Sequence, residues 1–405
     1  MGKKNAIVIY SWSTIWSMKN KSGAPSFYKT IELYINKGWD VFLILTEASN
    51  GGDNIVDKDH LFVLPKWKTD SLISPSNWTK GFLLLKMFRY NYFAKNVTRK
   101  IMKNHDNIKL FYAYEIHGVE AARHASLKYQ KPLVTRFQGT VATYFKDNLA
   151  TKIKQYFHLK ALRQRADLII MTDDGTQGLQ TLHKLGNQTE NIKFWKNGLD
   201  ILENEYQLSE EKVEKIRRGL GIKSEEIMML TVSRLQDWKR VDRSIEALAE
   251  ISKKDKRYKL VIIGDGPEGP KLHDMVIEKN LQKQVKFLGA VEHDKVYDYM
   301  ISSDIFLSLY DMSNVGNPLL EALTLKKCVV TLNVGDTKTV IKNGENGVLL
   351  DVENLSQLPQ IIMELGENIE ERNKLEKGAE KYSLKNLYSW DKRMEMEYEE
   401  ILKII

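Results

Sequence analysis

Two cationic side chains, Arg234 and Lys239, stand five positions apart, directly after an apolar run at 227–233. This spacing places both on a loop between a strand and the helix expected at 244–251. Fixed cations of this kind can neutralise phosphate charge without a metal ion. They can also stabilise the negative charge that builds on a departing diphosphate. The pattern therefore predicts a binding site for a nucleoside diphosphate.

A second strand, expected at 259–263, runs into Gly264, the first residue of a Gly-Asp-Gly-Pro segment. Strands and helices alternate from 227 to 321, which is typical of a parallel sheet. Parallel sheets bind ligands beyond the carboxyl ends of their strands, where these loops lie. We therefore expect the loops to meet at one edge of the sheet.

The third loop follows a strand at 304–309 and leads to a helix that begins near Pro318. The backbone N–H groups of Leu319 and Leu320 at this helix start can donate to an anion. Glu321, in the first turn, can accept hydrogen bonds from ribose hydroxyls. A simple contact between its charge and the helix dipole would also explain Glu321.

Four segments of this stretch occur in a recognisable order. They are Ser233-Arg234 to Lys239, Gly264 to Pro267, Val285 to Val291, and Pro318 to Ala322. Together they resemble the C-terminal domain of retaining GT-B glycosyltransferases of the family-four type, also called glycosyl transferases group 1. The resemblance implies an α/β protein with two Rossmann-like domains facing each other across a cleft, the GT-B fold. It also implies a C-terminal helix that returns to the N-domain.

At 405 residues the chain is too long for one ordinary core, so two domains are expected. The segment Asn-Gly-Leu-Asp at 197–200 resembles the end of the family's first domain. We therefore predict an N-terminal Rossmann-like domain at 1–200 that faces the acceptor and the membrane. A nucleotide-sugar-binding Rossmann-like domain is predicted at 201–385, followed at 386–405 by the helix that packs back on the first domain.

The sequence departs from the family pattern near the place of the donor sugar. The family usually has a Glu where this chain has Ser313. The polar side chains of Ser313, Asn314, Asn317 and Asp311 are candidates to contact the sugar instead. The nucleotide base is expected to meet mainly backbone near Leu288. The departure leaves the donor sugar open and permits a GT-B fold with weak or no catalysis.

In the first domain, Gln138 stands where many family members have a His near the reaction centre. Gln cannot act as a general base, but it can hold a hydroxyl or a developing charge by hydrogen bonding. The resemblance implies front-face attack, with the leaving phosphate taking the acceptor proton, so a protein base is not essential. His117 could be a polar group or base on the acceptor side, or be satisfied by backbone. Gly23 could let backbone approach the donor phosphate, or form a plain turn.

Charge is divided unevenly along the chain. Residues 1–200 carry 30 Lys and Arg against 16 Asp and Glu, whereas residues 201–405 carry 31 against 37. The segment 71–105 has seven bases and no acid, interleaved with aromatic and aliphatic residues. Its candidate membrane and acceptor residues are Lys80, Lys86, Arg89 and Phe88. A basic helix of this kind suits an anionic membrane surface, although a helix packed on its own sheet with a solvated basic face would look the same.

Other features limit the location and the partners. No run of about 18 uncharged apolar residues is present, and the apolar run at 6–10 is too short for a secretory signal. Cys328 is the only cysteine and lies in a run expected to be a buried strand. We expect no metal and no cofactor beyond the nucleotide-sugar substrate, and no nucleic-acid partner. We expect a cytoplasmic protein that is peripheral at the inner face of the membrane.

These expectations combine into one functional hypothesis. The chain would be a metal-independent retaining glycosyltransferase, a hexosyltransferase of polysaccharide or cell-envelope biosynthesis. It would move a sugar from a UDP- or GDP-linked donor to a lipid-linked or growing glycan. A sugar-nucleotide epimerase of the GT-B fold and a non-catalytic nucleotide-binding partner subunit are alternatives. Nucleic-acid binding by the basic half is another, but it leaves the donor-site residues unexplained. The donor base and sugar, the acceptor, the linkage and the oligomeric state stay open.

Overall fold

The computed structural model describes residues 4–12, 25–46, 56–66, 80–145, 148–202 and 206–405. The chain divides into two compact units. The N-terminal unit comprises Met1–Asp173, Gln177–Asn197 and Asp391–Ile405, and the C-terminal unit comprises Asp174–Thr176 and Gly198–Trp390. The end of the chain therefore belongs to the same unit as its beginning.

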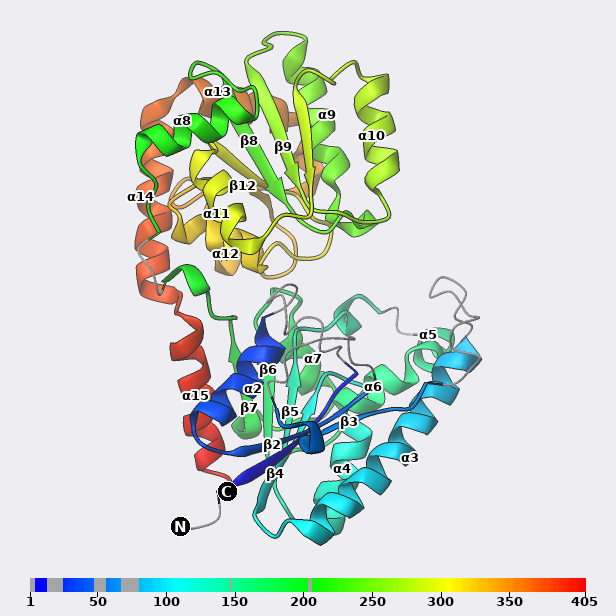
Figure 1. Cartoon of the computed structure of the whole chain (residues 1–405). Helices are drawn as coiled ribbons and strands as arrows, with labels where there is room; N and C mark the ends of the chain where they lie inside the picture. The colour runs from blue at the N-terminus through cyan, green and yellow to red at the C-terminus, as the bar shows by residue number, and fades with distance from the viewer. Residues whose placement is uncertain (1–3, 13–24, 47–55, 67–79, 146–147, 203–205) are drawn as a thin grey trace. The chain divides into compact units, whose positions relative to one another are not determined.

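The N-terminal unit is built on a seven-stranded parallel sheet with the order β3-β2-β1-β4-β5-β6-β7 (Figure 1). Its strands are β1 Ala6–Tyr10, β2 Asp40–Leu45, β3 Leu61–Val63, β4 Ile108–Tyr114, β5 Leu133–Phe137, β6 Leu168–Thr172 and β7 Ile192–Trp195. Its helices are α2 Ser26–Asn36, α3 Lys80–Asn104, α4 Val119–Tyr129, α5 Leu149–Lys154, α6 Tyr156–Leu162, α7 Gly178–Lys184 and α15 Trp390–Leu402.

The sheet of this unit forms because its strands are short, nearly uninterrupted apolar runs. All five residues of β1 are buried, as are all five of β6. Strands covered by helices on both faces need such runs, since neither face meets water. The strand order reverses between β1 and β4, so the loops that follow these two strands diverge and leave space at the carboxyl edge of the sheet.

The C-terminal unit repeats the arrangement with a six-stranded parallel sheet in the order β10-β9-β8-β11-β12-β13. Its strands are β8 Ile227–Val232, β9 Tyr258–Ile263, β10 Val285–Gly289, β11 Ile305–Ser308, β12 Cys328–Leu332 and β13 Val348–Leu350. Its helices are α8 Glu210–Gly219, α9 Val241–Ser252, α10 Gly269–Glu278, α11 His293–Ser302, α12 Asn317–Thr324, α13 Leu358–Glu367 and α14 Ile369–Asn386. Cys328 is buried in β12, as the sequence predicts.

In this unit the strand order reverses between β8 and β11. The loop after β8 carries Arg234 and Lys239, and the loop after β11 carries Ser313 and the start of α12. Ligands of open α/β sheets bind where the order reverses, beyond the carboxyl ends of the strands. The fold thus brings the predicted donor-site loops to one edge of one sheet.

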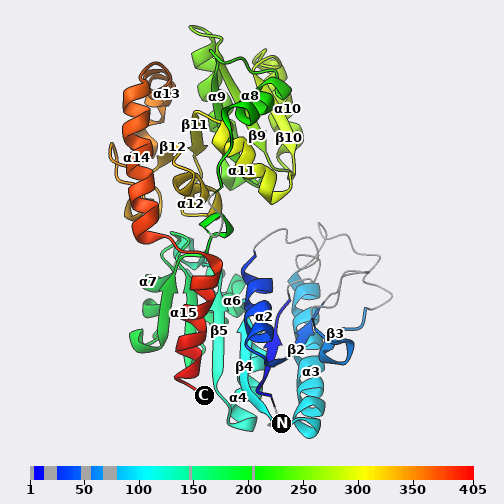
Figure 2. The same cartoon turned by 60° about the vertical axis from the view of Figure 1, so that its left-hand side comes forward.

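The last helix, α15, packs on the sheet of the N-terminal unit, and Figure 2 shows it lying along that sheet. Its Glu397 is fully buried and accepts a hydrogen bond from Tyr112 on β4 at 2.7 Å. The same carboxylate pairs with Arg136 on β5 at 3.1 Å and with Arg393, one turn earlier on α15, at 3.0 Å. A carboxylate without exposure to water requires such partners, so this group fixes the position of the helix.

The predicted fold is confirmed in its main features, namely two Rossmann-like parallel sheets and a C-terminal helix on the first of them. One region departs from a single continuous helix. The chain leaves helical geometry at Gln155 (φ −106°, ψ 15°), so residues 149–162 form two helices, α5 and α6. Nothing in the sequence marks this break. Among the described residues, no helix is both long and apolar enough to cross a membrane.

Candidate functional site

The loop after β8 is held in place by the glycine segment after β9. Gly264 has φ +130°, and a Cβ there would lie 1.8 Å from the carbonyl oxygen of Ser233, so only glycine fits. The Leu235 N–H donates to Asp265 O at 2.9 Å, and the Glu268 N–H donates to Leu235 O at 3.0 Å. The Gly264 segment therefore fixes the backbone on which Arg234 stands.

Lys239 lies against two aromatic rings. Its Nζ is 4.0 Å from the ring centre of Trp238 and 3.7 Å from that of Tyr310. The Tyr310 hydroxyl donates to Val232 O at 3.0 Å, and the Asp311 N–H donates to Trp238 O at 3.0 Å. The two loops that follow β8 and β11 are thus bonded together, and the lysine is held at their junction.

The ammonium of Lys239 sits in a place that disfavours its charge. Its pKa is lowered to about 7, mainly by burial and also by the nearby charge of Arg234, while Asp174 opposes the change. Arg234 itself is exposed. Two neighbouring cations that repel each other form a site suited to a group with two negative charges, because such a group relieves the repulsion. A diphosphate is a group of this kind.

In the loop after β11, the side chains of Asn314 and Ser313 are already hydrogen-bonded to other groups of the protein. Asn314 is fully buried, and its Oδ1 accepts from the Ser308 hydroxyl at 2.9 Å and from the Tyr310 N–H at 3.0 Å. The Ser313 hydroxyl donates to Asp174 O at 2.5 Å and accepts from the Val315 N–H at 3.2 Å. Contact of either side chain with a sugar stays a prediction, and it would require these bonds to be shared or broken.

The side chain of Asp311 forms ion pairs with two arginines. Its carboxylate pairs with Arg243 at 2.6 Å and with Arg240 at 3.3 Å. These pairs hold the β11 loop to the start of α9. Asp311 therefore has a structural role in this unit.

Helix α12 begins after Gly316, with Asn317 as its first residue and Pro318 in the first turn. The N–H groups of Leu319 and Leu320 both approach Gly316 O, at 3.1 and 3.2 Å. Asn317 is partly exposed. The helix start lies where the sequence predicts it, but an anion would have to share the two N–H groups with Gly316. Their role as anion donors stays a prediction.

Glu321 has a partner that sequence reasoning missed. The side chain is 3% exposed, and its Oε1 lies 3.0 Å from Nε2 of His293, the first residue of α11. Both ring nitrogens of His293 also lie 3.4 Å from the Tyr297 hydroxyl. Within the described part of the chain, the other carboxylate oxygen has no hydrogen bond or ion pair. One oxygen is thus held while the other is left for a ligand.

Burial by itself lowers the pKa of His293. The hydrogen bond and charge of Glu321, with the charges of Asp200 and Asp294, outweigh burial and raise the pKa above its ordinary value. No sequence motif marks His293 as a site residue, because its partner Glu321 is 28 residues away and belongs to a different helix.

Leu288 lies on β10, the strand next to β9, and is partly buried. With Tyr299 and Lys215 it lines a hollow of about 380 Å³. The next residue, Gly289, accepts at its carbonyl from the Gly264 N–H at 2.8 Å. The end of β10 therefore adjoins the glycine segment, while base contact at Leu288 stays a prediction.

A larger hollow of about 580 Å³ lies beside η7 (Asp237–Lys239), and its charge argues against a donor site. Six acids line it, against two bases. They are Asp237, Asp242, Glu268, Asp274, Glu278 and Asp311, with Arg240 and Lys271. A wall with this excess of carboxylates repels a diphosphate.

In the N-terminal unit, His117 follows β4 at the edge where the strand order reverses. Its ring stacks on Trp12, with the centroids 4.3 Å apart and the planes 14° from parallel. Burial lowers the pKa of His117 to about 4, with further contributions from His158 and Lys86. His117 is therefore neutral near pH 7, and its ring forms part of an aromatic surface.

Gln138 directly follows β5, the neighbouring strand. Its backbone N–H donates to Glu115 Oε1 at 2.7 Å, and its Oε1 lies 3.5 Å from Asn197 Nδ2. Its Nε2 is buried and has no acceptor among the described residues. Buried amide donors are normally hydrogen-bonded, so this one is a candidate to meet a substrate oxygen.

The predicted membrane residues all belong to α3 but do not point the same way. Phe88 is 62% exposed. Lys86 lies over the Trp12 ring at 5.5 Å, and Arg89 donates to Pro65 O at 2.9 Å, so both turn toward their own unit. Lys80 begins the helix, and Gly23 lies outside the described residues.

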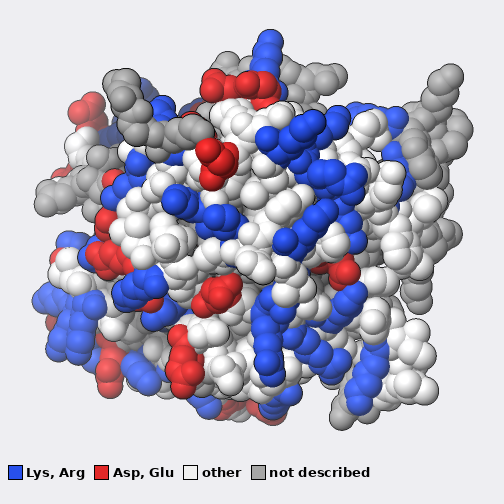
Figure 3. Space-filling view, turned by 90° about the horizontal axis from the view of Figure 1, so that it is seen from below, with Lys and Arg blue, Asp and Glu red and all other residues white. Residues whose placement is uncertain are grey.

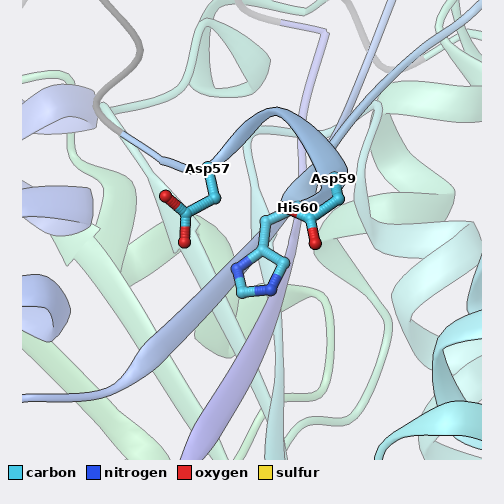
Figure 4. A group of neighbouring side chains, drawn as sticks. All are labelled: Asp57, Asp59 and His60. Atoms are coloured by element: carbon cyan, nitrogen blue, oxygen red, sulfur yellow. The ribbon is translucent and has the colours of Figure 1, made fainter.

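One group of described side chains has the composition of a metal site. Asp57, Asp59 and His60 offer ligand atoms that all lie within 4.8 Å of one another, and Figure 4 shows the ring between the two carboxylates. They belong to a single surface turn around η1 (Lys58–His60) that leads into β3. Both carboxylates are exposed, and the His60 ring packs on Phe42 at 4.1 Å. Packing accounts for the histidine, and metal independence stays a prediction.

Comparison with known proteins identifies the C-terminal unit. The family model described as Glycosyl transferases group 1 matches residues 212–382, from α8 to α14. Residues 212–382 belong to the Glycosyl transferases group 1 family. The segment holds Arg234, Lys239, His293 and Glu321, so the predicted resemblance is confirmed for the part of the chain that carries the candidate donor site.

Two curated proteins illustrate how far the likeness extends. The alpha-monoglucosyldiacylglycerol synthase of Acholeplasma laidlawii is 26% identical over 170 residues, which is 42% of each chain. The N-acetyl-alpha-D-glucosaminyl L-malate synthase of Bacillus anthracis is 29% identical over 176 residues, 42% of this chain and 45% of that protein. The matches thus span less than half of these relatives.

Solved structures share the fold over the whole chain. Anabaena Alr3699/HepE in complex with UDP aligns with a TM-score of 0.74 at 19% identity, covering 100% of both chains. WaaG, a glycosyltransferase involved in lipopolysaccharide biosynthesis, aligns with a TM-score of 0.69 at 17% identity, covering 96% of this chain and 98% of that one. Both units of this chain therefore have the GT-B architecture.

Proposed function

We propose that this chain is a retaining, metal-independent hexosyltransferase that uses a nucleotide-diphosphate sugar. The observation that carries the proposal is the pair Arg234 and Lys239 at the edge where the sheet order reverses, within a group 1 family segment. Two adjacent cations with mutual repulsion fit a diphosphate, and the free oxygen of Glu321 on the same unit fits ribose hydroxyls.

The relatives support a UDP-linked donor. Structures similar to this chain are described as complexes with UDP and with UDP-glucose. A GDP-linked donor presents the same phosphates, and the base would meet mainly backbone near Leu288. We therefore propose UDP-glucose or a related UDP-hexose as the first donor to test.

In the proposed reaction, the bond between the sugar C1 and the diphosphate oxygen breaks as the acceptor oxygen attacks C1 from the same face. The acceptor proton passes to the leaving phosphate oxygen, so charge and atoms balance without a protein base. Arg234 and protonated Lys239 stabilise the charge that develops on the leaving diphosphate. Gln138 and His117 hold the acceptor side by hydrogen bonding and ring contact. Gln138 has no basic group, and a pKa of about 4 makes His117 only a weak base.

For the acceptor we propose a lipid-linked or growing glycan at the cytoplasmic face of the membrane, as in cell-envelope polysaccharide synthesis. The positive charge of residues 1–200 supports an anionic surface near this unit. Phe88 and Tyr92, exposed by 62% and 72% on α3, support contact with lipid. One relative is named for a glucosylated diacylglycerol.

The decisive experiment measures UDP release from a panel of UDP- and GDP-sugars, with and without lipid extracts, and with the product linkage read by NMR. We expect acceptor-dependent release, an α-linked product from an α-linked donor, and turnover that is unaffected by EDTA. Release of free epimerised sugar without an acceptor would instead identify an epimerase. Binding of UDP without turnover of any donor would identify a non-catalytic partner subunit.

A further inference from the structure

Helix α3 presents an outward stripe that changes in character along its length. Phe88 and Tyr92 are its exposed aromatic end, and Lys95 and Arg99 continue it. The intervals of four, three and four residues put all four on one helix face. Lys86 and Arg89 lie off this face and contact Trp12 and Pro65 instead. The outward charge of α3 is therefore carried by its second half.

The cationic end of the stripe borders a small hollow between α3 and α4. Four basic side chains line it, namely Lys95, Arg99, His124 and Lys128. Buried Thr98 and the ring of Tyr129 also line it. None of the four bases forms an ion pair with any carboxylate in the described part of the chain. The acid nearest in sequence, Glu120, pairs with Lys160 at 2.6 Å.

The charges around this hollow repel one another. Burial lowers the pKa of His124, and Lys95 and Lys128 lower it further, with only Glu120 opposing them. Three permanent cations around a concave surface concentrate positive potential there. Figure 3 shows Lys and Arg in several groups on this face, one of them right of its centre, and α3 lies on the right in Figure 1. The surface is thus built for an anion that the chain does not supply.

The size of the hollow limits the anion to a small group. Its volume is about 50 Å³, and a cavity needs roughly 10–15 Å³ for one water. A group of a few heavy atoms fits, and a phosphate offers oxygens to several donors at once. Exposed apolar side chains flank the cations, with Phe88 and Tyr92 on α3 and Leu127, 63% exposed, on α4. Cations beside exposed aromatic and aliphatic groups are typical of a protein face at a lipid–water interface.

We propose that the hollow between α3 and α4 binds the phosphate of an anionic lipid headgroup while Phe88 and Tyr92 enter the interface. The proposal rests on the membrane-facing acceptor suggested above. In this proposal the residues that bind the membrane surface are Lys95, Arg99 and Lys128, rather than the predicted Lys86 and Arg89. It also assigns a discrete phosphate site rather than diffuse attraction.

The test compares two triple variants of equal charge in the full chain. One is Lys95→Gln/Arg99→Gln/Lys128→Gln. The control is Lys100→Gln/Lys103→Gln/Lys109→Gln, which removes three exposed cations of the same unit that do not line the hollow. Vesicles of phosphatidylcholine with phosphatidylglycerol, and of phosphatidylcholine alone, are co-sedimented with each protein.

We expect the first variant to lose about 100-fold in affinity for the anionic vesicles, corresponding to about 1 kcal/mol for each of three cations. The control should lose less than about tenfold. Equal losses in the two variants would overturn the discrete site. Phe88→Ser should weaken binding at both low and high salt, whereas Ile369→Ser, at a residue of the other unit with 60% exposure, should not. An unchanged Phe88→Ser variant would overturn the interfacial contact.

Further measurements distinguish a lipid phosphate from other phosphates, and distinguish failure of the membrane proposal from failure of the proposed function. In the first measurement, inorganic phosphate is added and the NMR signals of α3 and α4 are followed. If phosphate saturates the hollow but the protein does not bind vesicles, the ligand is not a lipid phosphate. Single-stranded RNA binding that is lost in the first variant, without vesicle binding, would also exclude a lipid phosphate as the ligand. Stabilisation by UDP should be equal in all variants. Failure of UDP to bind the unaltered protein would count against the proposed function and leave the vesicle result independent.

Discussion

Lys239 is the side chain whose protonation should respond most directly to the donor. Burial and, to a smaller extent, repulsion from Arg234 lower its pKa to about 7, and its Nζ lies against the rings of Trp238 and Tyr310. A bound diphosphate would bring negative charge to the same place and favour the ammonium form. We therefore predict that UDP binding raises the pKa of Lys239 toward its ordinary value and takes up a proton from solution above pH 7.

The size of this uptake follows from the pKa. With a pKa of about 7 in the free protein, roughly one tenth of the ammonium form is present at pH 8. Binding should then take up about 0.9 proton per UDP at pH 8 and about 0.5 at pH 7. Because only the ammonium attracts the phosphates, the Kd for UDP should rise about tenfold per pH unit above pH 7.

Isothermal titration calorimetry measures the uptake. UDP is titrated at pH 7 and pH 8 in two buffers that differ in protonation enthalpy, and the difference in heat gives the number of protons. More acidic conditions are avoided because a terminal phosphate itself titrates near about pH 6. Lys239→Arg is the matched control, since Arg stays charged throughout and should bind UDP with no uptake.

Two results would refute the reasoning. Equal heats in the two buffers at pH 8, with a Kd that stays constant from pH 7 to pH 9, would mean that Lys239 is not near the phosphates or is already charged. An uptake that persists in Lys239→Arg would assign the proton to another group. Either result would remove the main physical support for the donor site.

Three other variants test separate parts of the account. Arg234→Ala should lower turnover about 10²–10³-fold, since it removes one fixed charge from the leaving group, and it should leave the melting temperature unchanged because the side chain is exposed. His293→Ala should weaken UDP binding more than His293→Gln, because Gln can still donate to Glu321; equal Kd values for the two would argue against positioning. Glu397→Gln should lower the free energy of unfolding in urea by about 3–5 kcal/mol, because it leaves Arg136 buried without its carboxylate. An unchanged urea midpoint would show that the pair does not hold α15.

Much of the fold could be predicted from the sequence because parallel strands covered on both faces must be apolar runs. β1 and β9 are such runs, and their ends follow from the polar or glycine residues that come next. The break between α5 and α6 could not be predicted, since it has no Pro or Gly. The ion pair of Arg136 and Glu397 was equally out of reach, because it joins positions 261 apart.

The orientation of α3 had a signal that charge counting ignores. Tyr90, Ala94, Val97 and Ile101 are buried and recur at intervals of four, three and four residues, which defines the inner stripe of the helix. Lys86 stands four residues before Tyr90 and continues that stripe. Periodicity therefore separates the cations that face inward from those that face out, whereas composition treats them alike.

The candidate donor site likewise contains some residues that the sequence predicts and others that it does not. Arg234, Lys239 and Glu321 belong to ordered motifs, so the sequence alone brings them to one sheet edge. The residues that determine the electrostatic environment of these side chains do not belong to such motifs. His293 reaches Glu321 from another helix, and Tyr310 reaches Lys239 across the junction of two loops.

The family match falls on residues 212–382, whereas the aromatic surface at Trp12 and His117 lies outside it. A diphosphate and a ribose are recognised by a small set of groups, among them fixed cations, backbone donors and carboxylates. These groups lie on short segments, which is why motifs reveal the donor unit. An acceptor imposes requirements that differ from one glycan or lipid to another, and the residues that meet them come together only through the fold. The distinctive chemistry of this chain is therefore to be sought in the N-terminal unit, at Gln138, at the Trp12 and His117 rings, and in the hollow between α3 and α4.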